Sequence, residues 1–346
     1  MSLQTSGPAL SGALAAALAH PSMNHGYRPT LIRETSGSWL VCLARNGDRR
    51  PTHWLKVRKS VRTIPASRRK AEQLSAAQEY EAAIAISRHF SQFPEFRDSV
   101  PRPVQFLADH EAILMEYGGN RLLRDELWRR GNVISAVFSR GHLLNVVAAC
   151  GAWARLLHAM PPPPWLPAHQ VDALELRNRT LEAAARLPES LSRHVPLDAL
   201  LGWIRDLKPD HQHICVSHGD FQPGNVLVDG PQIGVIDMGT AGIRSIEDDL
   251  GTFVTFLFTQ KHRVVLGRAA GTRHLVRDIR DAFLSGYGIH SRDDLANLRP
   301  FMAWHIVQRL ADMCARIDRR PRSLRPFLHR RLVDWARLEL PLLLQT

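Results

Sequence analysis

The segment from Ser217 to Gly239, SHGDFQPGNVLVDGPQIGVIDMG, constrains the fold of this chain more than any other part. Two short apolar runs flank the turn residues Asp229-Gly230, a spacing that predicts a β-hairpin. A loop of turn-forming residues precedes the first strand, and an aspartate ends the second. The pattern therefore delivers Asp220, Asn225 and Asp237 to one end of the hairpin. Two carboxylates and a carboxamide in that position are the groups that hold a divalent cation beside a phosphate and orient a hydroxyl group.

The loop before the hairpin has the pattern His-Gly-Asp, with an asparagine five residues after the aspartate. This spacing turns the carboxylate of Asp220 towards a nucleophilic hydroxyl and returns the amide oxygen of Asn225 to the metal side. The simpler interpretation is a surface turn, because all these residue types are common in turns. Asp237-Met238-Gly239 adds weight to the first interpretation, because it follows the apolar strand Ile233–Ile236, whose rigid backbone can fix a chelating carboxylate. The two motifs in this order resemble those of kinase-like enzymes, and this resemblance implies a protein-kinase-like architecture.

The rest of the chain divides into a β-rich first part and a helical second part. We predict the fold class as α+β, with a small β-rich N-terminal lobe over 1–117, a Gly-containing hinge at Gly118-Gly119, and a large helical C-terminal lobe over 118–346. Residues 1–30 are expected to form an N-terminal helix or extension. In the second part, the hairpin around Asp229-Gly230 is the only β signal that the pattern gives. In the first part, period-2 and period-3.6 patterns predict strands at Trp39–Arg45, Trp54–Arg58, Val104–Leu107 and Ala112–Glu116, and a helix at Ala66–Phe90. In the second part, helices are predicted at Leu143–Met160, Leu174–Arg186, Leu197–Leu207, Glu247–Phe258, His274–Ser285 and Phe301–Ile317.

Composition narrows the class of protein and its compartment. The chain contains no apolar run long enough for a membrane span. Ala9–Ala19 is apolar, but no Lys or Arg comes before Arg28, so a short helix is a better interpretation than a signal peptide. The four cysteines are far apart and form no CxxC motif, which favours a reduced, cytoplasmic setting without a cysteine metal site. They are Cys42, Cys150, Cys215 and Cys314.

The chain is strongly basic, with a net charge of +12. Arginine is concentrated in Arg58–Lys70 and Arg319–Arg331. A solvated surface is the simpler interpretation. The alternative is attraction to an anionic partner such as a phosphorylated sugar or a membrane surface. No nucleic acid partner is expected, because no aromatic residues are interleaved with the arginines and no recognised nucleic-acid motif is present.

Across Arg33 to about Phe258, the chain resembles the aminoglycoside phosphotransferase family, the small-molecule branch of the protein-kinase-like fold that includes choline kinases. The resemblance is most specific across His218–Gly239. It implies an enzyme that uses ATP and Mg2+ to transfer the γ-phosphoryl group to a hydroxyl group of a small molecule. It also implies that Asp220 is the catalytic base and that Asn225 and Asp237 are the magnesium ligands.

The resemblance further implies which residues of the N-terminal lobe contact the nucleotide. Lys56, in the strand HWLKV, is expected to reach the α- and β-phosphates, and Trp54 is expected to lie against adenine. Lys56 should pair with a carboxylate of the following helix. Glu79 matches the family pattern best, with Glu81 second and Glu72 third.

Two further segments are candidates for nucleotide binding. Ser36, Gly37 and Ser38 lie where a phosphate-covering loop belongs, although a single glycine makes the motif weak. Glu116 and Tyr117 occupy the junction of the lobes, where the backbone in such folds bonds to adenine.

Several departures from the protein-kinase pattern indicate which kind of substrate receives the phosphoryl group. Gln222 stands where serine/threonine kinases usually have lysine, and only Thr240–Ile246 separates Asp237-Met238-Gly239 from the next helix. Asp249, in that helix, resembles the family's aspartate after this loop. A platform for an extended peptide is therefore missing, which favours a small hydroxylated substrate.

Composition leaves the acceptor class open. The C-terminal hundred residues are basic, so a neutral or anionic acceptor is at least as well supported as a cationic aminoglycoside. His305, Gln308 and Asp312 could share one helix face there. Two alternatives stay open, namely a membrane-surface kinase of a sugar or lipid-linked glycan and a non-catalytic pseudokinase. The presence of Lys56 together with the motif residues argues against the second.

Overall fold

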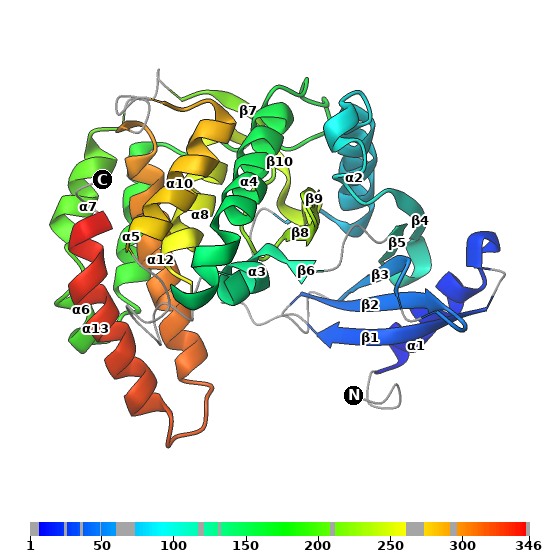
Figure 1. Ribbon diagram of the computed structural model, residues 1–346, viewed down its shortest axis with the longest axis horizontal. Helices are drawn as coiled ribbons and strands as arrows, with labels where there is room; N and C mark the ends of the chain where they lie inside the picture. The colour runs from blue at the N-terminus through cyan, green and yellow to red at the C-terminus, as the bar shows by residue number, and fades with distance from the viewer. Residues whose placement is uncertain are drawn as a thin grey trace. The chain divides into compact units, whose positions relative to one another are not determined.

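Two compact units make up the chain in the computed structural model, and each is described by itself (Figure 1). One comprises Met1–Asn120 with Ile233–Ala241, and the other comprises Arg121–Gln232 with Gly242–Thr346. The predicted lobe boundary and the Gly118-Gly119 hinge fall within 117–120, outside the described residues. The structure describes residues 7–23, 26–34, 37–48, 50–59, 73–116, 121–130, 133–207, 212–260, 273–290 and 296–343.

A five-stranded antiparallel sheet forms the first unit, with the strand order β1-β2-β3-β5-β4. All four strands predicted in this part of the chain are confirmed, and β1 was not among them. It begins at Tyr27, inside the segment predicted as helix or extension, and pairs with β2 from Tyr27↔Arg45 to Glu34↔Trp39. The strands are β1 (Tyr27–Glu34), β2 (Ser38–Arg45), β3 (His53–Arg58), β4 (Pro103–Leu107) and β5 (Ala112–Glu116), with short 3-10 turns at Pro21–Met23, Pro94–Phe96, Ala108–His110 and Met238–Thr240 (η8).

The N-terminal helix α1 (Gly7–Leu18) packs on the sheet. Its apolar side chains join those of β2, β3 and β5 in one buried cluster, which includes Leu55 and Val57. Because side chains alternate along a strand, Lys56 lies on the other face of β3. The N-terminal segment is therefore part of the core. The helix contributes Leu10, Ala13, Leu14 and Ala17 to this cluster.

Helix α2 (Ala76–Phe90) begins later than the sequence pattern predicts. Residues 73–75 are not helical, and residues 66–72 lie outside the described part of the chain. Ser75 and Gln78 form a capping box, in which the Ser75 hydroxyl accepts from the Gln78 N–H and the Gln78 side chain accepts from the Ser75 N–H. These bonds satisfy backbone groups that the first helical turn cannot pair, so they fix the helix start at Ala76.

The second unit is mainly helical, and all six helices predicted there are confirmed. Five of them agree with the prediction to within two residues at each end, whereas α4 begins ten residues earlier than predicted. Of the others, α13 was missed because its sequence mixes arginines with apolar residues and gave no clear period. The helices are α3 (Leu123–Arg130), α4 (Val133–His158), α5 (Ala173–Ala184), α6 (Glu189–Ser192), α7 (Leu197–Arg205), α8 (Ile246–Phe258), α10 (Arg273–Tyr287), α12 (Arg299–Ile317) and α13 (Arg325–Leu343).

The expectation of a single hairpin as the β structure of this half was wrong. Strand β7 (Ile214–Ser217) pairs antiparallel with β10 (Gly242–Ser245), and β6 (Arg121–Leu122) pairs with β8 (Val226–Asp229). These strands are two to four residues long and their pairing partners are distant in sequence, so a local sequence pattern does not predict the pairing. The predicted hairpin turn is present, with Gly230 at φ 60° and β9 (Gln232–Val235) following it.

Helices α4 and α10 approach each other at two glycines. A Cβ atom added to Gly151 would lie 2.0 Å from the carbonyl oxygen of Phe283, and one added to Gly286 would lie 2.1 Å from that of Ala148. Both distances are far below a van der Waals contact, so only glycine allows this separation of the two helices. None of the helices in the described ranges combines the length and apolarity that a membrane crossing requires.

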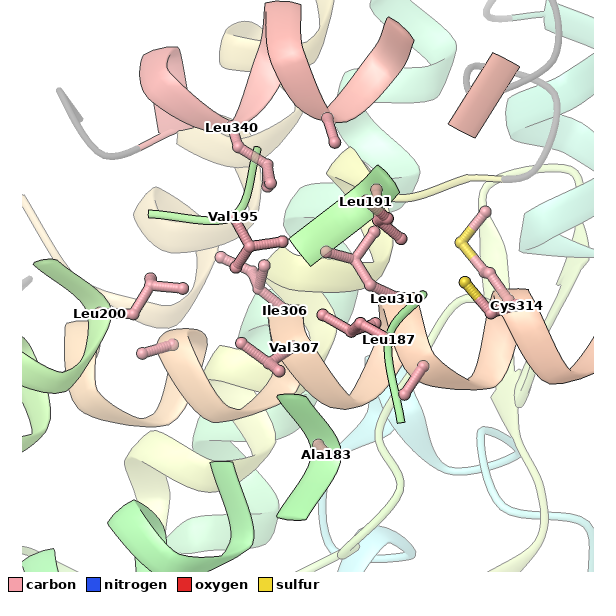
Figure 2. Close-up of a cluster of buried hydrophobic side chains, with 14 of the residues drawn as sticks. Ala183, Leu187, Leu191, Val195, Leu200, Ile306, Val307, Leu310, Cys314 and Leu340 are labelled. Carbon is pink, nitrogen blue, oxygen red and sulfur yellow. The ribbon is translucent and has the colours of Figure 1, made fainter. Parts of the chain in front are cut away.

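One side of helix α12 packs into a hydrophobic core of the second unit (Figure 2). Ile306, Val307, Leu310 and Cys314 pack there against side chains of α5, α6, α7 and α13. At helical spacing, His305, Arg309, Asp312 and Arg316 follow one another on the side of α12 away from this core. The polar side of this helix is therefore fixed by the packing of its apolar side.

Candidate active site

A buried ion cluster is the centre of the first unit. The Lys56 ammonium on β3 lies 2.5 Å from Oε1 of Glu79 on α2 and 2.5 Å from Oδ1 of Asp237. The side chains of Lys56 and Glu79 are 6% and 3% exposed, whereas that of Asp237 is 46% exposed. The cation is therefore enclosed, and part of the Asp237 carboxylate still faces outward.

The charge of Lys56 is maintained by its two partners. Burial lowers the pKa of an amine, but the charges of Asp237 and Glu79 and their hydrogen bonds outweigh it and raise the pKa of Lys56 above its usual value. Lys56 is therefore protonated at neutral pH. Of the three carboxylates that the sequence left open, Glu79 is the one that contacts Lys56, Glu81 is exposed, and Glu72 lies outside the described residues.

Asp237-Met238-Gly239 packs against α2 and against the residues just before this helix. The carbonyl oxygen of Gly239 accepts from the N–H of Leu74 at 2.9 Å, and a Cβ atom at Gly239 would come within 3.2 Å of Arg58 and Glu79. Asp237 itself adopts a left-handed backbone with φ 73°. Such a conformation is strained for a residue other than glycine and is often found at functional sites.

Arg58 is a residue of this cluster that sequence reasoning missed. Its Nη2 lies 2.7 Å from Oε2 of Glu79, so the two oxygens of that carboxylate are divided between Lys56 and Arg58. The alternation of β3 could have found it, because Arg58 follows Lys56 by two residues and shares its face.

The remaining residues predicted to contact a nucleotide are distributed around this sheet. Trp54 is buried on β3, and Ser38 is buried at the start of β2. Gly37 accepts a backbone hydrogen bond from Lys59 at 3.0 Å. Glu116 ends β5 and forms an ion pair with Arg102. Ser36 and Tyr117 lie outside the described residues.

In the second unit, Asp220 and Asn225 lie together. The Nε2 group of Gln222 donates to Oδ1 of Asp220 at 3.0 Å. The Nδ2 group of Asn225 donates to the carbonyl oxygen of Asp220 at 2.9 Å and to its Oδ2 at 3.3 Å. Two amide groups thus orient the carboxylate. Asn225 uses its Nδ2 group for these bonds, so its amide oxygen can serve as a metal ligand. Asp237 belongs to the other unit and is described only there.

Asp249 on α8 holds the backbone of the loop that leads to Asp220. Its Oδ2 accepts from the N–H of His218 at 2.7 Å, and its Oδ1 accepts from the N–H of Gly219 at 2.8 Å. His158 on α4 lies 3.3 Å from Oδ2 of Asp249. Burial would raise the pKa of Asp249, but the His158 contact and the His218 N–H outweigh it and bring the pKa to about 2. Asp249 is therefore an ionised, fully buried brace.

Aromatic packing also holds this loop in place. Phe221 is fully buried and stacks on Phe253 with ring centroids 5.0 Å apart and on Trp153 at 5.2 Å. The side chain after Asp220 is thus a hydrophobic anchor, while Asp220 stays half-buried. His158, the other partner of the loop brace, had no signal in the sequence beyond its place in an apolar helix.

The polar residues predicted to share a face of α12 are present with partners in the chain. Nε2 of His305 lies 2.8 Å from Oδ1 of Asp248, and Gln308 donates to Asp312 at 2.9 Å. Arg186 donates to Gln308 at 2.6 Å. These groups are therefore held by contacts within the second unit.

No group of three or more His, Cys, Asp or Glu side chains is arranged for a metal ion among the residues that the structure describes. Magnesium, however, usually binds proteins through one or two oxygen ligands, with waters and substrate phosphates completing its octahedron. Each unit offers an oxygen of this kind: the carboxylate side chain of Asp237 in the first unit is 46% exposed, and the amide oxygen of Asn225 lies in the second unit.

A family model and several solved structures match this chain. The family model described as the phosphotransferase enzyme family matches residues 66–301, more than half of the chain. A search of curated protein sequences found no match.

Solved structures of small-molecule kinases have a similar fold. An amicoumacin kinase in complex with AMP-PNP, Ca2+ and Ami matches with a TM-score of 0.58 and 14% identity, over 94% of this chain and 92% of that chain. An aminoglycoside phosphotransferase from Streptomyces rimosus matches with a TM-score of 0.51 and 18% identity, over 89% and 99%. A glucosamine kinase in complex with glucosamine, ADP and inorganic phosphate matches with a TM-score of 0.53 and 17% identity, over 92% and 80%. The predicted α+β, protein-kinase-like fold and the predicted family are confirmed.

Proposed function

The chain belongs to the phosphotransferase enzyme family, and from this premise we propose that it transfers the γ-phosphoryl group of ATP to a hydroxyl group of a small molecule. Family membership supports a kinase that acts on small molecules. The nucleotide, the metal and the roles of individual residues are our proposal. Two of the similar structures were determined with AMP-PNP or ADP, which supports a nucleotide as the donor.

The buried Lys56–Glu79–Asp237 cluster is the observation that carries the proposal. A lysine enclosed in a sheet is costly, since burial of a charge is compensated only by good pairing. Here two carboxylates keep the ammonium charged and hold it in place. A fixed positive charge of this kind suits the α- and β-phosphates of a nucleotide. Trp54, Ser36, Gly37, Ser38, Glu116 and Tyr117 are proposed to contact the rest of the nucleotide.

Asp220 is proposed as the base that accepts the proton of the acceptor hydroxyl. The amides of Gln222 and Asn225 orient its carboxylate through hydrogen bonds to its two oxygens. The position of the loop is set by the Asp249 brace, which holds the backbone N–H groups of His218 and Gly219. A base positioned in this way typically accelerates a reaction by about 10²–10⁴-fold.

Asn225 and Asp237 are proposed as the protein ligands of Mg2+. When bound, the ion would neutralise charge on the transferred phosphoryl group. One oxygen of the Asp237 carboxylate contacts Lys56, and the side chain is still 46% exposed. The same residue can therefore hold the proposed phosphate-binding lysine and bind a cation. The four cysteines are unpaired and buried, which supports the proposed cytoplasmic setting.

A membrane-surface kinase acting on a sugar or a lipid-linked glycan is a second candidate. The observation that favours it is the segment before and at the start of α13, where Leu324 and Phe327 are 49% and 55% exposed. Exposed arginines surround them at 319, 320 and 322. Basic and apolar groups together are typical of contact with anionic lipid. Sedimentation with phosphatidylserine vesicles tests this candidate. We expect the protein to bind the vesicles, and we expect this binding to weaken at higher salt concentration and in Phe327→Ser.

Substitution of Asp220 tests the proposed function. Asp220→Ala should keep Mg-dependent ATP binding, measured by calorimetry, but should lower phosphoryl transfer at least about 10²-fold. Asp237→Ala should weaken the Mg-dependent binding itself. Asp229→Ala, an exposed aspartate of the hairpin turn, is the matched control and should change neither. Unchanged turnover in Asp220→Ala would remove that residue from its role.

A further inference from the structure

Among the residues that the structure describes, Arg309 on α12 is a buried cation without a carboxylate partner. The residue is 6% exposed, and its guanidinium carbon lies 4.1 Å from the centroid of the Phe256 ring on α8. In the described part of the chain no carboxylate oxygen lies within 4.0 Å of its nitrogens, and its Nε atom is buried without a hydrogen-bond acceptor. The guanidinium therefore has a stacked face and donor edges that the described residues do not satisfy.

Neighbouring polar residues of the same helix differ from Arg309 in this respect. His305 contacts Asp248 and Thr252, at 2.8 and 2.9 Å. Gln308 bonds to both Arg186 and Asp312. Since buried polar groups normally have partners, the missing acceptor at Arg309 points to a group other than the residues that the structure describes.

The charge of Arg309 is retained although it is buried. Burial is the largest influence and lowers its pKa to about 10, while the charges of Asp312 and Asp220 act in the opposite direction. A group with this pKa is still protonated at neutral pH. An unpaired buried charge is among the most unfavourable features a fold can contain, so a merely structural role is a poor account of it.

Arg309 lies in the electrostatic neighbourhood of Asp220 and its loop. Asp220 is one of the carboxylates whose charge acts on it, and Arg124 and Arg316 are cations that act on it as well. Arg124, on α3, contacts the loop directly, because its backbone N–H donates to the carbonyl oxygen of Pro223 at 2.9 Å. Arg309 and Arg124 therefore both belong to the surroundings of the loop that carries the proposed base.

We propose that Arg309 binds an anionic group of the acceptor, a carboxylate or a phosphate, so that the substrate class of this enzyme is a hydroxylated anion; this proposal rests on the proposed function. A planar guanidinium with free donor edges matches either anion in a bidentate geometry. Stacking on Phe256 fixes the plane of the group before the acceptor arrives. A cationic acceptor would instead meet Arg309 and Arg124 as like charges.

The test uses acceptor pairs that differ in one anionic group. Glucose is compared with glucose 6-phosphate, galactose with galacturonate, and glycerol with glycerate, and glucosamine is included as a cationic probe. The wild type should favour the anionic member by about tenfold or more in kcat/KM, mainly through KM. In Arg309→Met this preference should disappear, and Arg309→Lys should restore part of it because the charge returns.

Arg299→Met is the matched control. Arg299 is an arginine of the same helix that stacks on Trp203, with its guanidinium carbon 5.7 Å from the ring centroid. It should keep the preference for anionic acceptors. A wild-type enzyme that treats both members of each pair alike, or that favours the neutral or cationic one, would overturn the proposal.

Binding of the same probes is measured by calorimetry in the presence of Mg2+ and AMP-PNP, so the proposal is decided even for probes that are not phosphorylated. Equal binding of the anionic probes to the wild type and Arg309→Met, or no binding to either, contradicts it. Failure of the proposed function would look different, because the wild type would then show no Mg-dependent nucleotide binding, whatever the acceptor.

Discussion

Asp249→Asn should remove a brace that is worth several kilocalories per mole and depends on pH in a defined way. The carboxylate of Asp249 accepts from the backbone N–H groups of His218 and Gly219 and contacts His158, and 1% of the residue is exposed. An asparagine has one acceptor oxygen in place of two, and its NH2 group would face an N–H donor. A hydrogen bond to a charged group contributes about 1.5–3 kcal/mol. We therefore expect a loss of about 3–5 kcal/mol in the free energy of unfolding.

The pH dependence gives a sharper magnitude. The pKa of Asp249 is lowered from 3.8 to about 2 in the folded chain. A depressed acid pKa contributes stability that is present above the unfolded value and lost as the pH falls through the folded value. The shift corresponds to about 2.5 kcal/mol in total, of which about 1 kcal/mol is lost by pH 3 and about 2 kcal/mol by pH 2.

Urea unfolding of the wild type and Asp249→Asn between pH 6 and pH 2 provides the assay. The difference in free energy of unfolding between the two proteins cancels the contributions of the other carboxylates. It should be constant above about pH 5 and shrink by about 1 kcal/mol at pH 3. A difference that stays flat from pH 6 to pH 2 would refute the assignment of Asp249 as an ionised buried brace.

Three further substitutions test the packing and the charges. Lys56→Met leaves its two carboxylate partners without their shared cation, so it should lower the free energy of unfolding by about 3 kcal/mol and raise the Kd for ATP; unchanged urea unfolding would contradict the ion cluster. Gly151→Ala should destabilise by about 1–3 kcal/mol, because its Cβ would meet a carbonyl oxygen at 2.0 Å, whereas Gly202→Ala, in open space on α7, should be neutral or stabilising. Arg309→Met should raise the melting temperature. The pKa shift from 12.5 to about 10, which is the net effect of burial and of the neighbouring charges, corresponds to a cost of about 3 kcal/mol for the charged group, and cation–π stacking recovers about 1–2 kcal/mol of it. A lower melting temperature for Arg309→Met would mean that the arginine is structural.

The parts of the site that the sequence could predict are those encoded by local spacing. Asp220, Asn225 and Asp237 sit on a loop and a hairpin whose turn residues and apolar runs lie within one short segment. The choice of Glu79 over Glu81 was harder, since it depends on the face that α2 turns to the sheet. That face follows from a helix start at Ala76, which the Ser75 cap determines.

What the sequence could not predict depends on contacts between distant segments. Strand β7 finds its partner β10 across more than twenty residues, and neither has a length or composition that distinguishes it from a loop. The burial of Arg309 depends on how α12 packs against α8, and an arginine in a helix is otherwise expected to be exposed. His158 and Arg58 are of the same kind, because their roles come from the partners that tertiary packing gives them.

The fate of the γ-phosphoryl group tests the account most directly. Wild-type protein is incubated with Mg2+, ATP labelled in the γ position and hydroxylated acceptors, and the labelled products are identified by chromatography and 31P NMR. The account predicts that the label appears as a phosphate monoester on an acceptor hydroxyl, in an amount that depends on Mg2+ and on the acceptor. Label that remains in ATP with every acceptor, or that is released only as inorganic phosphate, would contradict it.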